Sequence, residues 1–253
     1  MTEGPTTALC RYTDDAIYVR EKNLVEDMVG ETSFTAAMFF LITGREARPA
    51  DIAILDSVLV VLMDHGLSPS AITSRLLYMS APEALQAAVA GGLLAVGSQF
   101  VGTMENAALL LKEIAEDPAG IETAARRIAE DHRARRERMP GFGHHLHKPD
   151  DPRPPKLIAV AEAQGVDGRY IAALRALAGA VDEAAGRHIT INATGAIAAI
   201  LLEIDLPPEI LRGFAVISRA AGLVAHIREE QLKPGGRNLW TAGEKAVPYD
   251  AEG

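Results

Sequence analysis

The chain has 253 residues, of which 48% are hydrophobic and 23% charged, so it can bury a sizeable core and is not disordered by composition. Its formal charge of −9 argues against a general affinity for nucleic acid or for anionic membranes. The single cysteine, Cys10, excludes an intrachain disulfide, and the lack of a long apolar run predicts neither a secretory signal nor a membrane span, so we expect a cytoplasmic protein.

Helical periodicity dominates the pattern. Between Pro49 and Asp64 apolar residues recur every three or four positions, and Gly66 follows with the left-handed backbone that often ends a helix. The same reasoning predicts helices over most of the remaining chain. They are expected at Pro69–Met79, Pro82–Ser98, Thr103–Glu116, Ile121–Arg138, Pro154–Ala163, Arg169–Ala185, Ala196–Ile204 and Glu209–Leu232.

Extended structure is expected only over residues 12–19 and around residues 189–191. Turn signals of the kind that separate paired strands are scarce, so the predicted fold class is all-α. The Asp117–Pro118 break and the proline-rich residues 149–155 are the places where we expect the chain to pass between lobes.

The densest group of polar side chains follows a glycine-flanked phenylalanine, Phe142. The two glycines allow a tight turn that presents free N–H groups, and His144, His145, His147 and Arg153 come next. This pattern favours an anion site with a histidine placed for proton transfer, and a surface loop with incidental histidines is the simpler alternative. His144 and His147 could share a metal ion, but no further ligand set supports one, so we predict no metal.

Two other segments place a functional group beside apolar residues. His65 follows the helix at 49–64, and its ordinary explanation is a helix C-cap, where an imidazolium is favoured. Arg219 lies among apolar residues of the last predicted helix, with Gly222 on the same face and His226 one turn further on. A partly buried arginine needs an anionic partner, either a structural carboxylate or the carboxylate of a substrate.

A short polar interruption, Asn192–Gly195, precedes another apolar helix. The hydroxyl of a threonine can accept a backbone N–H at the start of a helix. Taken alone, Thr194 is therefore expected to be a capping residue.

Together these segments resemble the citrate synthase superfamily, and more closely its citryl-CoA lyase branch, which includes the C-terminal lyase portion of ATP citrate lyase. The segment from Phe142 to Arg153 is similar to the family's loop with a catalytic histidine and a carboxylate-binding arginine. The turn at His65 is similar to the segment with the lyases' other catalytic histidine. Ser218–His226 is similar to the helix whose arginine binds substrate carboxylate.

Two further matches extend the resemblance, which runs from about Phe34 to Trp240. Gly92–Asn106 resembles the lyase helix that has a phenylalanine, here Phe100, where citrate synthases place a histidine. Arg237–Trp240 is similar to the family's terminal arginine and tryptophan.

The chain departs from the family at two positions. Thr194 stands where the family has its catalytic aspartate, and Val101 stands where a glycine is usual in the lyases. An ordinary hydroxyl is a poor acid, so Thr194 implies a slower enzyme, a proton supplied by water held on Thr194 or by Glu105, or a different reaction. A degenerate, non-catalytic protein that binds a CoA ligand or acts as a partner subunit is the alternative function.

The resemblance implies a large helical body, residues 1–116 and 190–253, and a smaller inserted lobe, residues 117–189. It also implies a homodimer or larger homo-oligomer, an acyl-CoA substrate and no permanently bound cofactor. The implied reaction is the retro-Claisen cleavage of citryl-CoA, or of a related carboxylated 3-hydroxyacyl-CoA, to acetyl-CoA and a keto acid. The implied site comprises His65, His144 and Thr194 for catalysis, Arg153, Arg219 and Arg237 for substrate carboxylates, and Phe142 and Gly143 for CoA.

Overall fold

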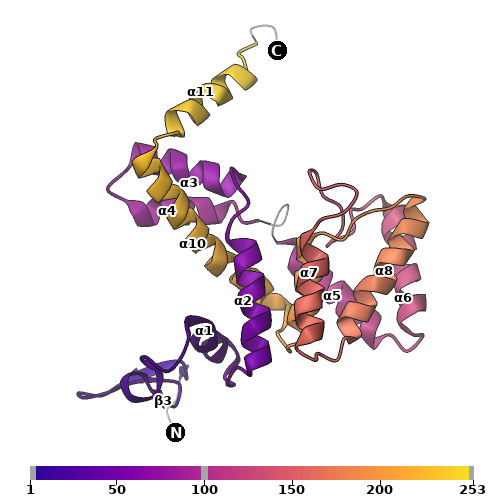
Figure 1. Ribbon diagram of the computed structural model, residues 1–253, viewed down its shortest axis with the longest axis horizontal. Coiled ribbons are helices and arrows are strands. Elements are labelled where there is room, and N and C mark those ends of the chain that lie inside the picture. The colour runs from indigo at the N-terminus through magenta and orange to yellow at the C-terminus, as the bar shows by residue number, and fades with distance from the viewer. Residues whose placement is uncertain (1–3, 98–101, 251–253) are drawn as a thin grey trace.

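The computed structural model describes residues 4–97 and 102–250. Helices make up most of this part of the chain, which confirms the all-α prediction (Figure 1). The α-helices are α1 (Phe34–Thr43), α2 (Pro49–Met63), α3 (Pro69–Ser80), α4 (Leu85–Leu94), α5 (Thr103–Glu116), α6 (Ile121–Arg135), α7 (Arg153–Ala163), α8 (Arg169–Ala185), α9 (Ala193–Leu202), α10 (Leu211–Leu232) and α11 (Gly236–Ala246).

A small antiparallel sheet with strand order β1-β2-β3 lies near the N-terminus. Its strands are β1 (Cys10–Tyr12), β2 (Ile17–Val19) and β3 (Lys22–Asn23), and a π-helix at Leu24–Met28 follows. The extended structure predicted over residues 12–19 is present at residue 12 and at residues 17–19, but not between them. The chain reverses at residues 13–16, where the N–H of Thr13 donates to the carbonyl of Ala16 at 2.8 Å.

Most predicted helices have the expected bounds. Those of α5 and α8 match, and α2, α3, α7 and α10 differ from the prediction by one or two residues at an end. Helix α6 stops at Arg135 because Arg136 adopts a left-handed φ of 56°. Helix α4 is shorter than predicted, and the expected end at Ser98 lies outside the described residues. Helices α1 and α11 were not predicted.

The helices form two groups with α2 between them (Figure 1). Helices α3, α4 and α10 pack together on one side, and α5 to α9 pack on the other, while α2 contacts α10 as well as α7 and α9. Every residue of α9 is buried, so this helix lies at the centre of the core. The predicted division into residues 1–116 with 190–253 and residues 117–189 stays a prediction.

Among the described residues, the helical stretch 208–232 is long and apolar enough to span a membrane by length and composition. In the structure this stretch contains α10, which packs against α2, α3 and α4. One face of α10 carries the polar groups of Ser218, Arg219 and His226 toward those helices. The stretch is therefore partly buried by these helices, with 44% of its apolar window inside the fold.

Candidate active site

The loop that carries His144 is fixed against the start of α9. Gly141 and Gly195 are in such close contact that a Cβ added to Gly195 would lie 2.5 Å from the carbonyl oxygen of Gly141. The N–H of Gly143 donates to the carbonyl of Thr190 at 2.8 Å, and the side chain of Asn192 donates to the carbonyl of Gly143 at 3.0 Å. Only glycines permit the approach of Gly141 to Gly195, and Gly143 is explained by its left-handed φ of 79°.

The free N–H groups predicted for this loop are not free. The N–H of Phe142 donates to the carbonyl of Met139, and that of Gly143 donates to Thr190. The side chain of Phe142 packs against the hydrophobic core. A role of Phe142 and Gly143 in CoA binding stays a prediction, and it would have to use other atoms than these N–H groups.

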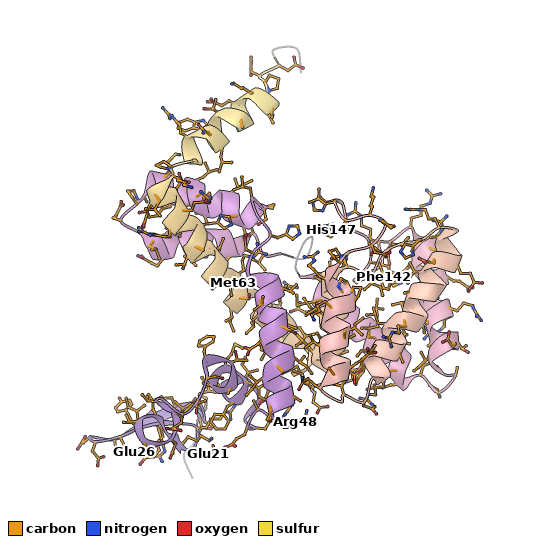
Figure 2. The ribbon with its side chains drawn as sticks, in the orientation of Figure 1. Glu21, Glu26, Arg48, Met63, Phe142 and His147 are labelled. Atoms are coloured by element: carbon orange, nitrogen blue, oxygen red, sulfur yellow. The ribbon has the colours of Figure 1, made fainter. Side chains whose placement is uncertain are left out.

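Three histidines from two distant parts of the chain lie close together. The ring centroid of His65, just after α2, lies 5.8 Å from that of His144 and 5.9 Å from that of His147. The rings of His144 and His147 are stacked with centroids 4.4 Å apart. Figure 2 shows His147 on the side of its loop that faces the end of α2, where Met63 lies.

The hydrogen bonds of His144 determine which of its nitrogens carries the proton. The N–H groups of Leu146 and His147 donate to Nδ1 of His144, at 3.1 and 3.0 Å. A neutral imidazole that accepts at Nδ1 carries its hydrogen on Nε2. This Nε2 lies 3.3 Å from Nη2 of Arg153, which is also a donor. Two adjacent donors are suited to a shared acceptor, such as an oxygen of a bound carboxylate or alkoxide.

Arg153 is held in place by Asp151. Its Nε and Nη2 donate to the two carboxylate oxygens of Asp151 at 2.9 and 2.6 Å. The Asp151 side chain is fully buried, and although burial raises its pKa, the hydrogen bonds and charge of Arg153 outweigh this and lower the pKa overall. This two-point contact fixes the plane of the guanidinium beside His144.

Both predicted catalytic histidines are neutral at pH 7. Burial, His147 and the charge of Arg153 lower the pKa of His144 from 6.5 to about 4. Partial burial and the charges of Arg153, His147 and Arg219 lower the pKa of His65. The charge of Arg153 therefore acts on both His65 and His144, and the charge of Arg219 acts on His65.

The same cluster is the candidate for a metal site. The ligand nitrogens of His65, His144 and His147 lie within 4.8 Å of one another, and His65 supplies the third ligand that the sequence pattern lacked. The tautomer of His144 opposes metal binding, because Nδ1 accepts two hydrogen bonds and Nε2 carries the hydrogen, so neither nitrogen has a free lone pair. The absence of a metal stays a prediction, which this geometry favours.

Arg219 is a buried cation without an anionic partner. It is 6% exposed, and no carboxylate of residues 4–97 or 102–250 lies within ion-pair distance of it. Its Nη1 donates to the hydroxyls of Ser68 and Ser70, at 3.1 and 3.4 Å, and its Nε has no hydrogen-bond partner among these residues. Burial lowers the pKa of Arg219, partly offset by the charge of Asp64. A buried cation of this kind is suited to bind an anionic ligand.

Helix α10 places Arg219 and His65 relative to each other. Ser218 donates its hydroxyl to the carbonyl of Leu59 on α2. A Cβ added to Gly222 would lie 1.9 Å from the carbonyl oxygen of Met63, so this position of α10 admits only glycine. One turn later Nε2 of His226 contacts Oδ1 of Asp64 at 2.8 Å.

Thr194 is not the helix cap that its position alone predicted. Asn192 is the N-cap of α9, and its Oδ1 accepts the N–H groups of Thr194 and Gly195 at 3.0 and 3.2 Å. The hydroxyl of Thr194 donates to the same Oδ1 at 2.7 Å and lies 2.8 Å from the hydroxyl of Thr103. Because its only proton is given to Asn192, Thr194 has none to offer a substrate in this arrangement.

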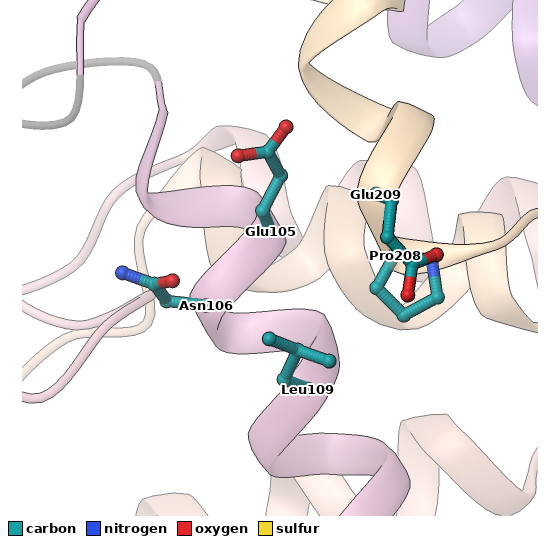
Figure 3. Close-up of a pocket in the computed structure, with 5 residues that line it drawn as sticks. All are labelled: Glu105, Asn106, Leu109, Pro208 and Glu209. Carbon is teal, nitrogen blue, oxygen red and sulfur yellow. The ribbon is translucent and has the colours of Figure 1, made fainter.

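Glu105, the other acid considered from the sequence, is paired with Arg212. It also lines a pocket between α5 and the start of the 208–232 stretch, together with Asn106, Leu109, Pro208 and Glu209 (Figure 3). None of the three clustered histidines lines that pocket. Because the carboxylate of Glu105 forms an ion pair with Arg212, Glu105 is not suited to deliver a proton.

Arg237 is not brought to the cluster within one chain. It lies on α11, which packs against α3 and then extends away from the other helices (Figure 1). Its guanidinium lies 4.8 Å from the ring centroid of Trp240 on the same helix. Phe100 and Val101, the two other positions noted from the resemblance, lie outside the described residues.

Several side chains that shape the site were missed by the sequence analysis. Asp151, which holds Arg153, and Asp64, which contacts His226, are the clearest examples. Both stand next to predicted site residues, but their partners are known only once the fold is known. The contact between Asp64 and His226 joins positions 162 residues apart.

The family model described as citrate synthase, C-terminal domain, matches residues 7–238. The citryl-CoA lyase of Hydrogenobacter thermophilus is 28% identical and superposes with a TM-score of 0.87, over 97% of this chain and 94% of that one. The ATP citrate lyase of Methanosaeta concilii, solved with (3S)-citryl-CoA, is 19% identical with a TM-score of 0.80, over 98% of this chain and 42% of that one, which shows the fold alone.

Among curated sequences, the citrate synthase of a Synechocystis species is 26% identical over 219 residues, which are 84% of this chain and 53% of that protein. The citrate synthase of Heyndrickxia coagulans is 24% identical over 221 residues. The chain spans 51% to 61% of the length of the curated relatives that it matches.

Proposed function

Because the chain belongs to the citrate synthase family, we propose that it is a carbon–carbon lyase that cleaves citryl-CoA, or a related carboxylated 3-hydroxyacyl-CoA, by a retro-Claisen reaction. The predicted citrate synthase-like helical fold is confirmed, and so is the resemblance to the citryl-CoA lyase branch. The choice of a lyase over a synthase is supported by the solved citryl-CoA lyase, which is 28% identical and superposes with a TM-score of 0.87.

One observation carries the proposal: the buried guanidinium of Arg219 has no anionic partner among the described residues and acts electrostatically on His65. A substrate carboxylate would supply the missing charge. Arg153 and Nε2 of His144 add two donors that lie 3.3 Å apart and suit a shared acceptor. A carboxylated hydroxyacyl group offers the two kinds of oxygen that these residues would bind.

The geometry supports different roles for the two histidines. In the proposed reaction a base removes the hydroxyl proton of the substrate, the C–C bond breaks, and its electron pair forms the enolate of the thioester. His144 presents an N–H, so it would donate a hydrogen bond to the oxygen that becomes the keto group. The ring of His65 makes no hydrogen bond to another described residue and is neutral, so it would act as the base.

The last step requires a proton on the enolate carbon, where the family uses an aspartate. Neither Thr194 nor Glu105 is suited to this step, because the first gives its proton to Asn192 and the second is paired with Arg212. We assign the step to a water molecule, which makes it the slow step of the proposed reaction.

We further propose a homodimer or larger homo-oligomer in which Arg237 serves a second copy. Arg237 contacts no other predicted site residue of its own chain, and α11 extends away from the body. Trp240 on the same helix is 48% exposed, as expected of a side chain that packs against a partner. Removal of α11 would then lower both the oligomeric state and the substrate affinity.

The proposed roles predict the pH dependence of kcat/KM. A base must be unprotonated to act, and the pKa of His65 is lowered from 6.5. Activity should therefore rise with pH, reach half of its plateau below pH 6.5, and stay constant through pH 7 to 8. Steady-state kinetics between pH 4.5 and 8 would measure this. Arg153→Gln (R153Q), which removes a nearby cation, should move the midpoint to higher pH, and a wild-type midpoint above 6.5 would contradict the role of His65.

The non-catalytic alternative is supported by Thr194, which stands at the position of a catalytic aspartate. Binding of CoA distinguishes an intact acyl-CoA site from a lost one. At 100 times the dissociation constant a ligand stabilises the folded state by about 2.7 kcal/mol, so CoA should raise the melting temperature by roughly 5–10 °C. Differential scanning fluorimetry with CoA and with adenosine monophosphate as control would measure this. No shift at millimolar CoA would favour a partner subunit without an acyl-CoA site.

The function itself is tested by a screen of 3-hydroxyacyl-CoA thioesters that carry a free carboxylate, with products identified by mass spectrometry. The proposal expects citryl-CoA to yield equal amounts of acetyl-CoA and oxaloacetate. Another carboxylated thioester that yields acetyl-CoA faster would keep the reaction class and change the substrate. Binding of these thioesters with no cleavage of any would leave only the non-catalytic alternative.

A further inference from the structure

A second group of buried polar side chains lies next to the histidine cluster and has no part in the chemistry above. At its centre is Arg75 of α3, which is 5% exposed. Its Nε donates to Nδ1 of His226 at 3.1 Å, its Nη1 donates to Glu230 at 3.0 Å, and its Nη2 pairs with Glu229. One guanidinium thus contacts three side chains of α10.

One arm of this network leads to the turn that carries His65. Because Nδ1 of His226 accepts from Arg75, its Nε2 carries the hydrogen and donates to Oδ1 of Asp64 at 2.8 Å. The other oxygen of Asp64 accepts the N–H of Gly66 at 3.2 Å. Arg75 orients His226, His226 holds Asp64, and Asp64 holds the backbone beside His65.

The other arm leads to the start of α11. The carboxylate of Glu230 is buried, and its Oε1 accepts the N–H groups of Gly235 and Gly236 at 2.8 and 2.7 Å. Burial raises the pKa of Glu230, but these N–H groups and Arg75 outweigh it and lower the pKa overall. Glu230 therefore fixes the direction in which α11, with Arg237 as its second residue, leaves the body.

We propose that Arg75 is a positioning residue that couples the start of α11 to the turn of His65. The guanidinium is a rigid plane, so a movement of Glu230 at one of its edges must move the Nε–H that orients His226 at another. The proposal rests on the proposed function only for the roles of His65 and Arg237, and the coupling itself can be measured without turnover.

Two reporters follow the two ends of the network. Trp240 is the only tryptophan of the chain and lies on α11, so its fluorescence reports on that helix. The Cε1–H NMR signal of His65, assigned by its loss in His65→Gln (H65Q), gives the titration midpoint of the catalytic cluster. Neither reporter needs a substrate.

The central experiment changes Glu230 to glutamine (E230Q). The coupling predicts a change in Trp240 emission and also a shift of the His65 midpoint by roughly 0.3 pH units or more. In the background of His226→Gln (H226Q), which interrupts the connecting arm, E230Q should still change Trp240 but should no longer move His65. Arg75→Gln (R75Q) should change both the Trp240 emission and the His65 midpoint. If R75Q does not fold, E230Q alone and in the H226Q background still tests the proposal.

The control variant is Arg45→Gln (R45Q), which breaks an arginine–carboxylate pair with the buried Asp51 at the opposite end of α2. It should lower the melting temperature and leave both reporters unchanged. The proposal is overturned if E230Q leaves His65 unmoved, if the His65 shift persists unchanged in H226Q, or if R45Q moves His65 as much as E230Q does. A wild type that cleaves no thioester would remove the proposed function and leave this result unaffected.

Discussion

Replacing Arg219 by methionine (R219M) is expected to lower kcat/KM for citryl-CoA by about 10²–10³-fold and to leave the protein at least as stable as the wild type. The value of kcat/KM falls because methionine cannot replace a buried guanidinium that binds a substrate carboxylate. The folded state stays stable because Arg219 is 6% exposed and has no anionic partner among the described residues, so the substitution removes a desolvated charge. Steady-state kinetics and urea unfolding of one preparation measure both effects.

The control for R219M is the other buried arginine, Arg75, which has three partners on α10. Arg75→Met (R75M) leaves the buried carboxylate of Glu230 without its cation, which costs about 3–5 kcal/mol in the free energy of unfolding. If R219M destabilises the protein as much as R75M does, Arg219 is a structural residue and the proposed substrate contact is wrong.

The second large effect is expected from restoring the carboxylate that the family uses. Thr194→Asp (T194D) should raise the rate of acetyl-CoA release from citryl-CoA by about 10²–10⁴-fold, the usual contribution of a general acid. The position is 8% exposed, so burial would favour the protonated form of a carboxyl group there, and the hydroxyl of Thr103 lies 2.8 Å from the present Thr194 hydroxyl to orient it. Single-turnover kinetics followed by mass spectrometry measure the gain.

Thr194→Asn (T194N) is the matched control, since an amide has the shape of the carboxyl group and no proton to deliver. It should show no gain. An equal gain in both variants would mean that shape, not proton donation, limits the rate. If neither T194D nor the wild type cleaves citryl-CoA, while another carboxylated thioester is cleaved, the acyl group of the substrate is a different one.

The helices could be predicted where a local signal marks both ends. Helix α8 begins after Gly168 and ends before Gly186, both left-handed, and its bounds were predicted correctly. Helix α1 was missed although Ser33 caps it and Gly44 ends it, because its residues are apolar on nearly every face and show no period. Helix α11 begins at Gly236, directly after a glycine cap, and is largely exposed, so its local sequence does not predict a helix. Its start is held by Glu230, which is a neighbour in space.

The candidate site was predictable in its residues but not in its electrostatics. The resemblance pointed to His65, His144, Arg153 and Arg219. The structure brings the first three together, and Arg219 acts on His65 electrostatically. The tautomer of His144, the Asp151 partner of Arg153 and the missing partner of Arg219 all depend on contacts that residue spacing does not reveal. Those contacts indicate which histidine can donate a hydrogen bond and which can act as a base. They also distinguish an arginine held by a carboxylate from one suited to bind a ligand.

The most direct test compares citryl-CoA with the analogue in which a methyl group replaces the carboxylate on the carbinol carbon, 3-hydroxy-3-methylglutaryl-CoA. The two thioesters share the hydroxyl, the thioester and the distal carboxylate, so the difference in acetyl-CoA release reports on the carboxylate of the carbinol carbon. We expect citryl-CoA to be cleaved at least about 10²-fold faster, since an unpaired buried guanidinium would remain with the analogue. Equal rates of acetyl-CoA release from the two thioesters would contradict the account.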